Sequence, residues 1–474
     1  MKWHGCEVFN HRGARGSVQA YAVWLTLRPA SCAPEIMAHF HTHSIGVLLK
    51  FVLSSWGSRG DVEPCAAVGR ELVRRGHDVT LAVPPDLVGF GTSAVPNTVG
   101  FGPTLQMDSY RDFWTGVFSQ PWKVRELTRL MRDVWAPYRH NYAQMSAVLN
   151  ELAEDADLIV VNNTGFDVQA ANVAEYRNIP LATLHWHPLR PNGQIMPFLP
   201  PPVCRAIMHA NDWLSRGGYA RDAEMAQRAD LGLPRASGSW PQRIVKYRAL
   251  EIQAYDAAWF PGLSAEWAKW GDRRPIVGAL AMEIPTPADD EILSWIAAGP
   301  PPIFFGFGST PVTSPSDTVA MISDVCAQLG ERAVIGAGFS DFTGLPQCEH
   351  AKVVGTVNFG AIFPACRAVV HHGGAGTTAF GLRAGMPTLI LATDADQALW
   401  GRQVEKLGVG LARRLSRLTE TSLAADLRIL LDPHRAEAAR EFSTKMAKPV
   451  ESVVRAADLM EKFARTPRSR SPRS

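Results

Sequence analysis

The hydrophobic pattern alternates between short apolar runs and longer amphipathic stretches over most of the chain. Short apolar runs bounded by glycine, proline or polar residues are typical of buried strands. We expect strands at residues 45–54, 78–83, 157–162, 180–185, 259–261, 275–278, 303–307, 333–336, 368–370 and 388–392. We expect helices at residues 62–75, 122–132, 138–153, 168–176, 289–298, 315–329, 377–384, 420–431 and 433–463, with Pro137 as a break before 138. Alternating strands and helices predict an α/β protein with doubly wound parallel sheets.

Length and the distribution of proline and glycine predict two domains. A chain of 474 residues normally holds two domains, each with its own core. A cluster of prolines and glycines marks residues 279–302 as a linker between an N-terminal domain at 45–278 and a C-terminal domain at 303–432. Residues 1–44 show no clear period, and we expect an unstructured extension without a folded role. The Arg/Ser/Pro-rich tail at 464–474 is expected to be disordered.

Composition and charge exclude several classes of protein. With 46% hydrophobic residues the chain has the composition of a soluble globular protein, and it has no apolar run long enough to span a bilayer. A net charge of +3 is too small to indicate nucleic acid as a partner, although it permits peripheral contact with an anionic inner membrane surface. The seven scattered cysteines form no CxxC pair, which argues against zinc and disulfides and favours a reduced, cytoplasmic location.

The most informative stretch begins at the expected strand 368–370. It continues as HHGGAGTT, and the pattern after it predicts a helix. Glycines allow a tight turn and let a ligand approach the backbone closely. Because free N–H groups and the positive end of a helix dipole meet here, the turn predicts a phosphate site. His372 and Thr377 can add side-chain donors beside Gly374 and Gly376, and these four residues are the expected diphosphate contacts.

A second loop follows the next expected strand, 388–392, and carries Asp396 and Gln397. In an open parallel sheet both loops lie at the carboxyl edge, where ligands bind. An acid and an amide suit the hydroxyl groups of a sugar, whereas the glycine turn suits a phosphate. The two loops together therefore predict that the ligand is a nucleotide sugar.

These strings resemble the donor signature of a known family. HHGGAGTT, GLRAGMPTLIL and DQALWG look like the signature of family 1 glycosyltransferases of the GT-B fold, and the closest likeness is to bacterial and fungal members that glycosylate lipids, sterols and antibiotic aglycones. The resemblance extends, more weakly, over about residues 49–465. It implies two Rossmann-like doubly wound domains that face each other across a cleft, with the last helix, 433–463, crossing back to the N-terminal domain.

The string GSRGDVEP after the first strand matches the N-terminal signature of the same group, and it contains Asp61. In the family this aspartate is the expected catalytic base. Asp61 also stands just before the predicted helix, where aspartate is favoured as an N-cap, so a purely structural role is the competing interpretation. His185 and His187 flank a strand end and are the next residues to test as the base.

The resemblance implies further donor contacts. Family members use the loop after the first strand of the C-terminal domain against the donor phosphates, which makes Ser309 and Thr310 candidates. They hold the nucleoside by backbone contacts near the position of Val357. Some relatives carry histidine or tryptophan in this stretch, whereas this chain has Asn358 and Phe359. The choice between uridine and thymidine therefore stays open.

The acceptor side is expected in the N-terminal domain. In the family the region equivalent to the aromatic-rich residues 104–150 helps to line the acceptor pocket. Trp114 and Phe118 stand in a part of this region that has the composition of a loop, where apolar groups suggest a ligand surface. His187 is the third acceptor-binding candidate, and ordinary core packing is the competing interpretation for the aromatics.

The implied reaction moves a hexose or deoxyhexose from a nucleoside-diphosphate sugar to a hydroxyl of an apolar acceptor, above all a lipid or glycolipid. A single displacement inverts the anomeric centre while Asp61 takes the hydroxyl proton. Because the helix N-terminus and His372 would stabilise the departing diphosphate, we expect neither a metal ion nor a cofactor. The sequence leaves the oligomeric state open.

Three other functions compete with this interpretation. A nucleotide-sugar epimerase would share the fold and the donor loop but would not need an apolar acceptor region. A non-catalytic activator of a partner transferase would be expected to lack Asp61 or Asp396, and both are present. A nicotinamide oxidoreductase is least supported, because the spacing of Gly57 and Gly60 does not form the GxGxxG fingerprint.

Overall fold

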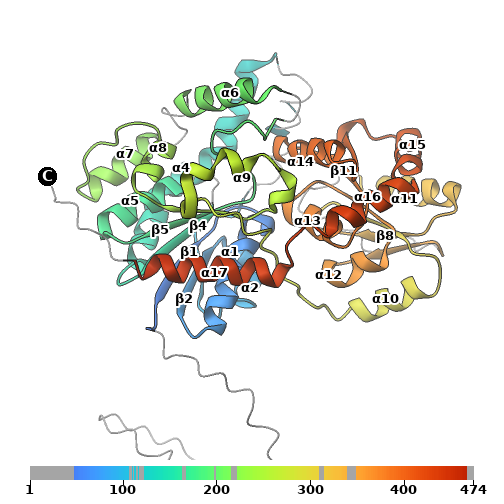
Figure 1. The fold of residues 1–474 in the computed structure, drawn as a ribbon, viewed down its shortest axis with the longest axis horizontal. Helices are drawn as coiled ribbons and strands as arrows, with labels where there is room; N and C mark the ends of the chain where they lie inside the picture. Colours follow the sequence, from blue (N-terminus) through green and yellow to red (C-terminus); the bar gives the residue numbers. More distant parts are fainter. Residues whose placement is uncertain are drawn as a thin grey trace, which may run out of the picture. The chain divides into compact units, whose positions relative to one another are not determined.

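The computed structural model describes residues 47–466 except 106–108, 110–111, 114–115, 117–121, 163–166, 197–198, 215–220, 309–313 and 339–348. Its strands form two six-stranded sheets, and neighbouring strands are parallel throughout both of them (Figure 1). Helices lie in most of the described connections between successive strands, as is usual for parallel pairing. The predicted doubly wound α/β architecture is confirmed.

The first sheet has the strand order β3-β2-β1-β4-β5-β6. Its strands are β1 (Lys50–Ser54), β2 (Asp78–Val83), β3 (Thr98–Gly100), β4 (Leu158–Asn162), β5 (Leu181–His185) and β6 (Leu250–Gln253). The central strands are near-continuous apolar runs because helices cover both faces of the sheet. The order reverses between β1 and β4, so the loops after these strands open the crevice in which doubly wound sheets bind ligands.

The second sheet repeats this arrangement in the order β12-β11-β10-β7-β8-β9. Its strands are β7 (Ile303–Gly306), β8 (Ala333–Gly336), β9 (Ala351–Val354), β10 (Ala368–His371), β11 (Thr388–Ala392) and β12 (Gly410–Arg414). Here the order reverses between β7 and β10. The glycine turn HHGGAGTT follows β10 directly and therefore lies at this reversal.

The helices named below are α1 (Arg59–Arg74), α4 (Val124–Leu152), α5 (Asp167–Arg177), α6 (Pro201–Leu214), α7 (Arg221–Asp230), α8 (Trp240–Lys246), α10 (Asp289–Ala297), α11 (Pro315–Leu329), α13 (Ala375–Arg383), α14 (Ala395–Lys406), α15 (Glu420–Leu430), α16 (Pro433–Ser443) and α17 (Pro449–Ala464). The remaining described helices are α2 (Val88–Thr92), α9 (Leu263–Glu266) and α12 (Phe359–Ile362), with single 3₁₀ turns at Pro85–Leu87, Ala257–Trp259, Ala268–Arg273, Phe363–Ala365 and Leu415–Arg417. The predicted bounds of β2, β8, β11 and α11 agree with the structure. Residues 189–245, for which the sequence pattern predicts no element, contain α6, α7 and α8.

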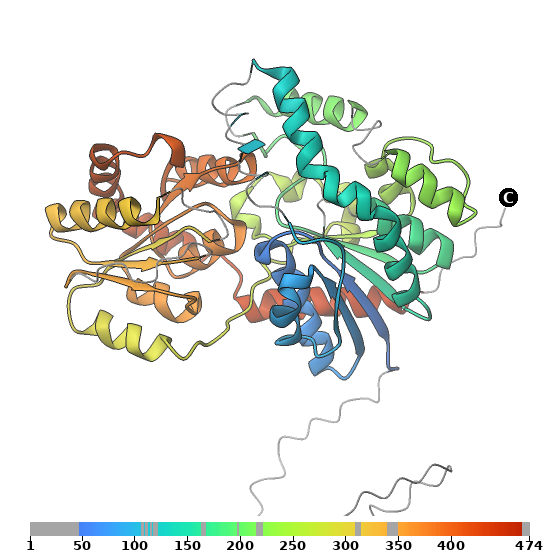
Figure 2. The ribbon, with the colours of Figure 1, turned by 180° about the vertical axis from the view of Figure 1, so that it is seen from behind.

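The break predicted at Pro137 is wrong. Figure 2 shows α4 as one continuous helix through the proline. A proline inside a helix removes one backbone hydrogen bond. Tyr138, Tyr142, Met145 and Leu149 are buried at helical spacing against the first sheet, and this packing holds the helix together on the C-terminal side of the proline.

Two predicted strands and one predicted helix also need correction. Residues 259–261 are not a strand, since the 3₁₀ turn Ala257–Trp259 ends there, and 275–278 make only a single bridge between Ile276 and Gln253. The sixth strand is β6, whose sequence LEIQ is polar at alternate positions although all four residues are buried. The expected helix 433–463 is two helices, because Pro449 begins α17 after the turn that follows α16.

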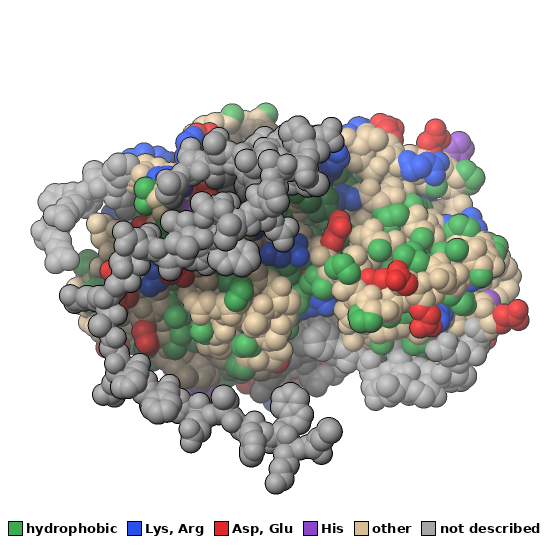
Figure 3. Space-filling view, turned by 90° about the horizontal axis from the view of Figure 1, so that it is seen from below, with side chains coloured by type: hydrophobic (Ala, Val, Ile, Leu, Met, Phe, Trp, Pro, Cys, Tyr) green, Lys and Arg blue, Asp and Glu red, His purple; other side chains and the backbone are tan. Residues whose placement is uncertain are grey.

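The last helix, α17, packs against α1 and contributes Ala456, Ala457 and Met460 to the core of the first sheet (Figure 1). None of the helices in the described ranges has the length and apolar character needed to cross a membrane. Figure 3 shows acidic and basic side chains interspersed with apolar ones, as the small net charge of +3 leads one to expect.

Candidate active site

A cavity of about 820 Å³ lies between the carboxyl ends of the two sheets and is lined by residues from both. The predicted site residues that line it are Asp61, His187, Val357, His372, Gly374, Gly376, Thr377, Asp396 and Gln397. Trp114, Phe118, Ser309 and Thr310 lie outside the described residues. Residues that are far apart in the sequence therefore meet in one cavity, whose volume suits a ligand of nucleotide-sugar size.

The two histidines of the glycine turn have different surroundings. His371 ends β10 and is completely buried, and its Nδ1 accepts a hydrogen bond of 2.9 Å from the N–H of Gly373. Gly373 has a φ of +97°, and a Cβ there would lie 2.7 Å from Ile390 Cγ2. His371 therefore shapes the turn and does not line the cavity, whereas the backbone of Gly373 both shapes the turn and lines the cavity.

His372 lies between two glycines at the cavity. A Cβ on Gly308 would lie 2.4 Å from the imidazole Cε1, and one on Gly374 would lie 2.6 Å from Nε2. Burial lowers the pKa of His372 to about 4, so the ring is neutral at pH 7. A neutral imidazole donates one N–H. His372 can thus give a hydrogen bond to an anion, but it brings no positive charge.

The first turn of α13 faces the same cavity. The helix begins at Ala375, two residues before the predicted start, and Gly374 caps it without a side-chain acceptor. Thr378, not Thr377, turns its hydroxyl back to the carbonyl oxygen of Gly374 at 2.8 Å. A Cβ on Gly376 would meet no atom within 4 Å. The N–H groups of this turn are thus open to an anion, and the helix dipole favours one there.

The polar side chains at the start of α14 have different roles. Asp394 caps the helix by accepting the N–H of Gln397 at 2.8 Å. Gln397 Oε1 in turn accepts from the backbone N–H and the hydroxyl of Thr393 at 2.7 and 2.8 Å. Gln397 therefore has only its NH₂ group left for a ligand. The Asp396 side chain is 54% exposed and can accept hydrogen bonds from hydroxyl groups.

Asp61 belongs to the first turn of α1, so its expected position just before the helix is wrong. The helix starts at Arg59 with Ser58 as its N-cap, and Asp61 is the third helical residue. Its Oδ2 accepts from the N–H and the hydroxyl of Ser58 at 2.6 and 2.8 Å. Gly57 has a φ of +140°, and a Cβ there would lie 2.3 Å from this oxygen. The glycine therefore makes room for the carboxylate.

The environment of Asp61 suits a base that works near neutral pH. Burial raises its pKa, the two hydrogen bonds from Ser58 lower it and the negative charge of Asp396 raises it, with a net pKa of about 6. A base is most effective when its pKa is close to the working pH. At pH 7 most Asp61 carboxylates are ionised and can accept a proton.

His187 and His185 have different positions in the structure, because only His187 lines the cavity. His187 lines the cavity, and its Nε2 lies 3.9 Å from Asp396 Oδ1, which comes from the second half of the chain. Its Nδ1 is buried without a hydrogen-bond partner. His185 is fully buried, lies 2.7 Å from the Thr183 hydroxyl through Nε2, and does not line the cavity. Burial lowers the pKa of His185 well below its usual value. Because the side chain does not line the cavity, the structure does not support His185 as the alternative base.

Several lining residues were not predicted from the sequence. The aromatic ones are Trp56, Trp135, Trp186, Trp240, Tyr255, Trp259, Phe304, Phe359, Phe380 and Trp400. Trp186 precedes His187 at the end of β5, and this neighbourhood is a signal that could have identified it. Near Val357, which is buried, the segment from Gly355 to Phe359 forms one wall. Within the described residues no group of three or more His, Cys, Asp or Glu side chains has the arrangement of a metal site.

Two doubly wound sheets whose switch-point loops line one cavity define an enzyme of the GT-B type. Residues 325–460 match the family model of the erythromycin biosynthesis protein CIII-like C-terminal domain. An uncharacterized glycosyltransferase of Mycobacterium tuberculosis is 52% identical over 422 residues, which are 89% of this chain and 100% of the relative. A sterol 3-beta-glucosyltransferase of Arabidopsis thaliana is 27% identical over 416 residues, with 81% of this chain and 63% of the relative covered.

Solved structures agree on the fold. The glycotransferase of kitacinnamycin matches with a TM-score of 0.61 at 19% identity, over 88% of this chain and 99% of that chain. The glycosyltransferase VinC, solved in complex with dTDP, matches with a TM-score of 0.56 at 19% identity, over 87% and 100%. The chain belongs to the family 1 glycosyltransferases, and its fold is GT-B.

Proposed function

We propose that this glycosyltransferase moves a hexose or deoxyhexose from a UDP- or dTDP-sugar to a hydroxyl of an apolar acceptor, with inversion at the anomeric carbon. One observation carries the proposal. Asp61 from the first half and the open first turn of α13 from the second half line the same cavity. A carboxylate with a raised pKa suits proton removal, and the helix N-terminus suits a diphosphate.

In the proposed reaction the acceptor oxygen attacks the anomeric carbon as the bond from that carbon to the diphosphate oxygen breaks. The acceptor proton passes to Asp61, and the bonding electron pair leaves with the diphosphate. The N–H groups of the first turn of α13 and the single N–H of His372 stabilise the new negative charge. Asp396 and the NH₂ group of Gln397 hold hydroxyl groups of the sugar. A single displacement of this kind inverts the anomeric centre.

The donor nucleoside is proposed to lie against the wall that contains Val357, with Asn358 and Phe359 beside it. dTDP stays in the proposal because the structure of VinC holds it, and UDP stays as the alternative that the family resemblance leaves open. Ser309 and Thr310 are retained as proposed diphosphate contacts on the family resemblance alone. No metal ion or cofactor is assigned, so we expect full turnover in the presence of EDTA.

The acceptor is proposed to be a lipid, sterol or glycolipid. Trp56, Trp135 and Trp186 line the same cavity as Asp61 and His187, and their rings suit an apolar body with a hydroxyl at its end. A relative glucosylates sterols according to its name, which agrees with this chemistry. Trp114 and Phe118 are retained as proposed acceptor contacts on the resemblance. Such an acceptor favours a cytoplasmic enzyme in peripheral contact with a membrane.

The deciding experiment is a matrix of donors and acceptors. UDP-glucose and dTDP-glucose are each offered with a sterol, a long-chain alcohol, a glycolipid and free glucose, and release of nucleoside diphosphate and formation of product are measured. We expect release that depends on an apolar acceptor and is lost in Asp61→Asn. Release with free glucose alone would contradict the acceptor class. Conversion of the donor sugar without acceptor would identify an epimerase, and nucleotide binding without any turnover would favour an activator of another transferase.

A further inference from the structure

The chain passes from the first sheet to the second through a segment that is buried at its start. Residues 279–282, which we call the strap, are between 4 and 8% exposed. Ala279, Leu280 and Met282 also line the cavity. A linker that only joins two domains normally runs through solvent. The burial of this one means that its position is set by contacts with both halves.

One end of the strap is held by the last residue of α13. Arg383 Nη2 donates to the carbonyl oxygen of Ala279 at 3.1 Å and lies 3.5 Å from Asp256 Oδ2. That same carboxylate oxygen accepts the N–H of Ala279 at 3.4 Å. The other end of α13 is the open turn at the cavity, and the helix has nine residues in all. A helix of this length is a rigid rod of about 14 Å.

The second crossing of the chain meets the first at Asp256. Ala447, in the turn between α16 and α17, donates its N–H to Asp256 Oδ1 at 2.6 Å. Gly278, at the start of the strap, has a φ of +96°, and a Cβ there would lie 2.3 Å from Ser452 Oγ on α17. The buried carboxylate of Asp256 therefore joins both crossings to the donor helix α13.

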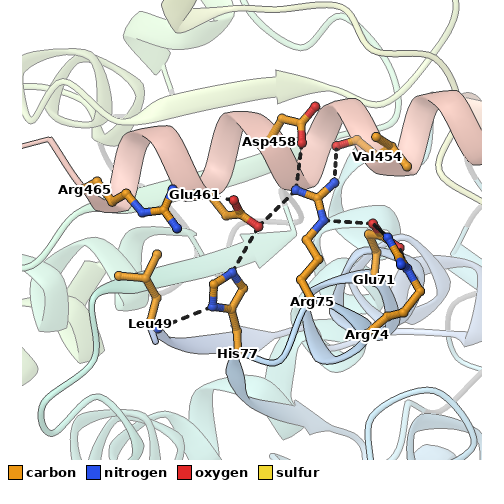
Figure 4. Close-up of polar contacts among 9 residues, drawn as sticks. All are labelled: Leu49, Glu71, Arg74, Arg75, His77, Val454, Asp458, Glu461 and Arg465. Atoms are coloured by element: carbon orange, nitrogen blue, oxygen red, sulfur yellow. Dashed lines mark hydrogen bonds and ion pairs between the residues drawn. The ribbon is translucent and has the colours of Figure 1, made fainter. Parts of the chain in front are cut away.

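The other end of the strap is held by the helix that carries the proposed base. Glu63 Oε1 accepts the N–H of Met282 at 3.0 Å, and Glu63 is two residues after Asp61 on α1. The far end of α1 is fixed to α17, where Arg75 contacts Asp458, Glu461 and the carbonyl oxygen of Val454 at 2.7, 3.0 and 3.2 Å (Figure 4). Both ends of α1 are thus tied to segments that cross between the sheets.

We infer that the strap couples the donor site to the base: Arg383 and Glu63 are positioning residues through which occupancy of the α13 turn sets the place of Asp61. The inference rests on the proposed function. A diphosphate that contacts the first turn of α13 displaces this helix. The displacement moves Ala279 through its hydrogen bond with Arg383, and it moves Glu63 through its hydrogen bond with Met282. Asp61 lies one half-turn of helix before Glu63 and moves with it.

Kinetics and nucleotide binding test the coupling. Arg383→Met and Glu63→Ala each remove one end of the strap's attachment, and we expect kcat to fall about 3- to 30-fold while calorimetric binding of UDP or dTDP stays nearly unchanged. Glu63→Gln and Arg383→Lys keep an acceptor and a donor at these places and should retain most of kcat. The double variant should fall no further than the worse single one, because both act through the same strap.

A matched control and a second readout separate coupling from damage. Arg413→Met removes a partly buried pair with Asp426 that does not touch the strap, and kcat should stay at the wild-type value. Hydrogen exchange reports the coupling without any acceptor: added UDP should protect residues 374–377 and 59–63 in the wild type and in Arg413→Met. In Arg383→Met it should protect only 374–377.

The possible contrary results are distinct. Additive losses in the double variant, or protection of 59–63 that persists in Arg383→Met, would overturn the coupling while leaving the transferase proposal intact. If neither UDP nor dTDP protected 374–377 in the wild type, the proposed donor site would fail, and the coupling with it. If Arg383→Met or Glu63→Ala did not fold, hydrogen exchange of the wild type would carry the test, and protection of 374–377 by UDP without protection of 59–63 would overturn the coupling.

Discussion

Asp61 both fastens the turn before α1 and lines the cavity, and one substitution separates these roles. In Asp61→Asn the amide oxygen still accepts the N–H of Ser58, while the proton acceptor is lost. We expect kcat to fall about 100-fold or more, which corresponds to about 2.7 kcal/mol of transition-state stabilisation. Because burial raises the pKa of Asp61, the ionised carboxylate costs stability at pH 7, so the Tm should stay the same or rise slightly. Turnover near the wild-type rate would leave Asp61 a structural residue.

The dependence of activity on pH follows from the same carboxyl group. Only the ionised form accepts a proton, so kcat/KM should decline as the pH falls through about 6, the raised pKa of Asp61. The bonds from Ser58 lower this pKa, and loss of the hydroxyl in Ser58→Ala should move the acid limb to higher pH. A profile recorded between pH 5 and 8 checks both statements. An acid limb that does not move in Ser58→Ala would show that another group controls it.

The neighbouring histidines provide a third test at this scale. His372→Ala removes a donor to a charged oxygen and should weaken binding of UDP or dTDP by about 1–3 kcal/mol in calorimetry. Because burial lowers the pKa of His372 to about 4, the affinity due to this residue should not change between pH 6 and 8. Unchanged affinity in His372→Ala would refute the donor-site assignment. His371→Ala should instead lower the Tm, since His371 holds the N–H of Gly373.

At the scale of the element, the glycine in the first turn of α13 lowers helix stability but leaves space for a ligand. Gly376 is a helical residue at which a Cβ would meet nothing within 4 Å, and it lines the cavity. Gly376→Ala should raise stability by about 0.4–1 kcal/mol through lower entropy of the unfolded chain. Its methyl group would enter the space proposed for the diphosphate, so affinity for UDP or dTDP should fall.

Gly89 offers the matched control for that substitution. It lies in α2, also has open space at the position of a Cβ, and does not line the cavity. Gly89→Ala should therefore raise the Tm without changing nucleotide affinity. If Gly376→Ala bound nucleotide as tightly as Gly89→Ala does, the turn of α13 would not be the diphosphate site.

At the scale of the whole molecule, α17 joins the end of the chain to the first sheet. Met460 is completely buried against α1 and the first-sheet core. Met460→Ala should lower the free energy of unfolding by about 2–5 kcal/mol, measured by denaturant titration. Lys462→Ala on the exposed side of the same helix should leave it nearly unchanged, since that side chain is 76% exposed. Equal effects of the two variants would mean that α17 is not part of the cooperative core.

Aromatic contacts between the two halves of the chain also belong to the scale of the whole molecule. Trp259 follows β6 of the first sheet, and its ring centroid lies 4.9 Å from that of Trp400 on α14 and 5.3 Å from that of Phe442 on α16. Together with the strap and α17, this aromatic cluster connects the two halves of the chain whose residues line the cavity.

The local sequence pattern determined the bounds of several strands and helices and the two loops of the donor side. Apolar runs and helical periods are properties of neighbouring residues, and they placed β2, β8, β11 and α11 at their observed bounds. Glycine strings at strand ends report a backbone requirement that is equally local, so the loops of His372 and Asp396 could be predicted as parts of one site. The switch-point rule then puts both loops at the same sheet edge.

Only the tertiary structure decided which atoms are available in that site. The sequence HHGG does not distinguish the histidine that braces Gly373 from the one at the cavity, because their burial depends on β7 and β11 on either side. Asp61 could be read as an N-cap until the helix start at Arg59 placed it in the first turn. The polar strand β6 and the continuity of α4 through Pro137 depend on burial by distant segments. Long-range packing outweighs local preference at these points, and no local pattern records it.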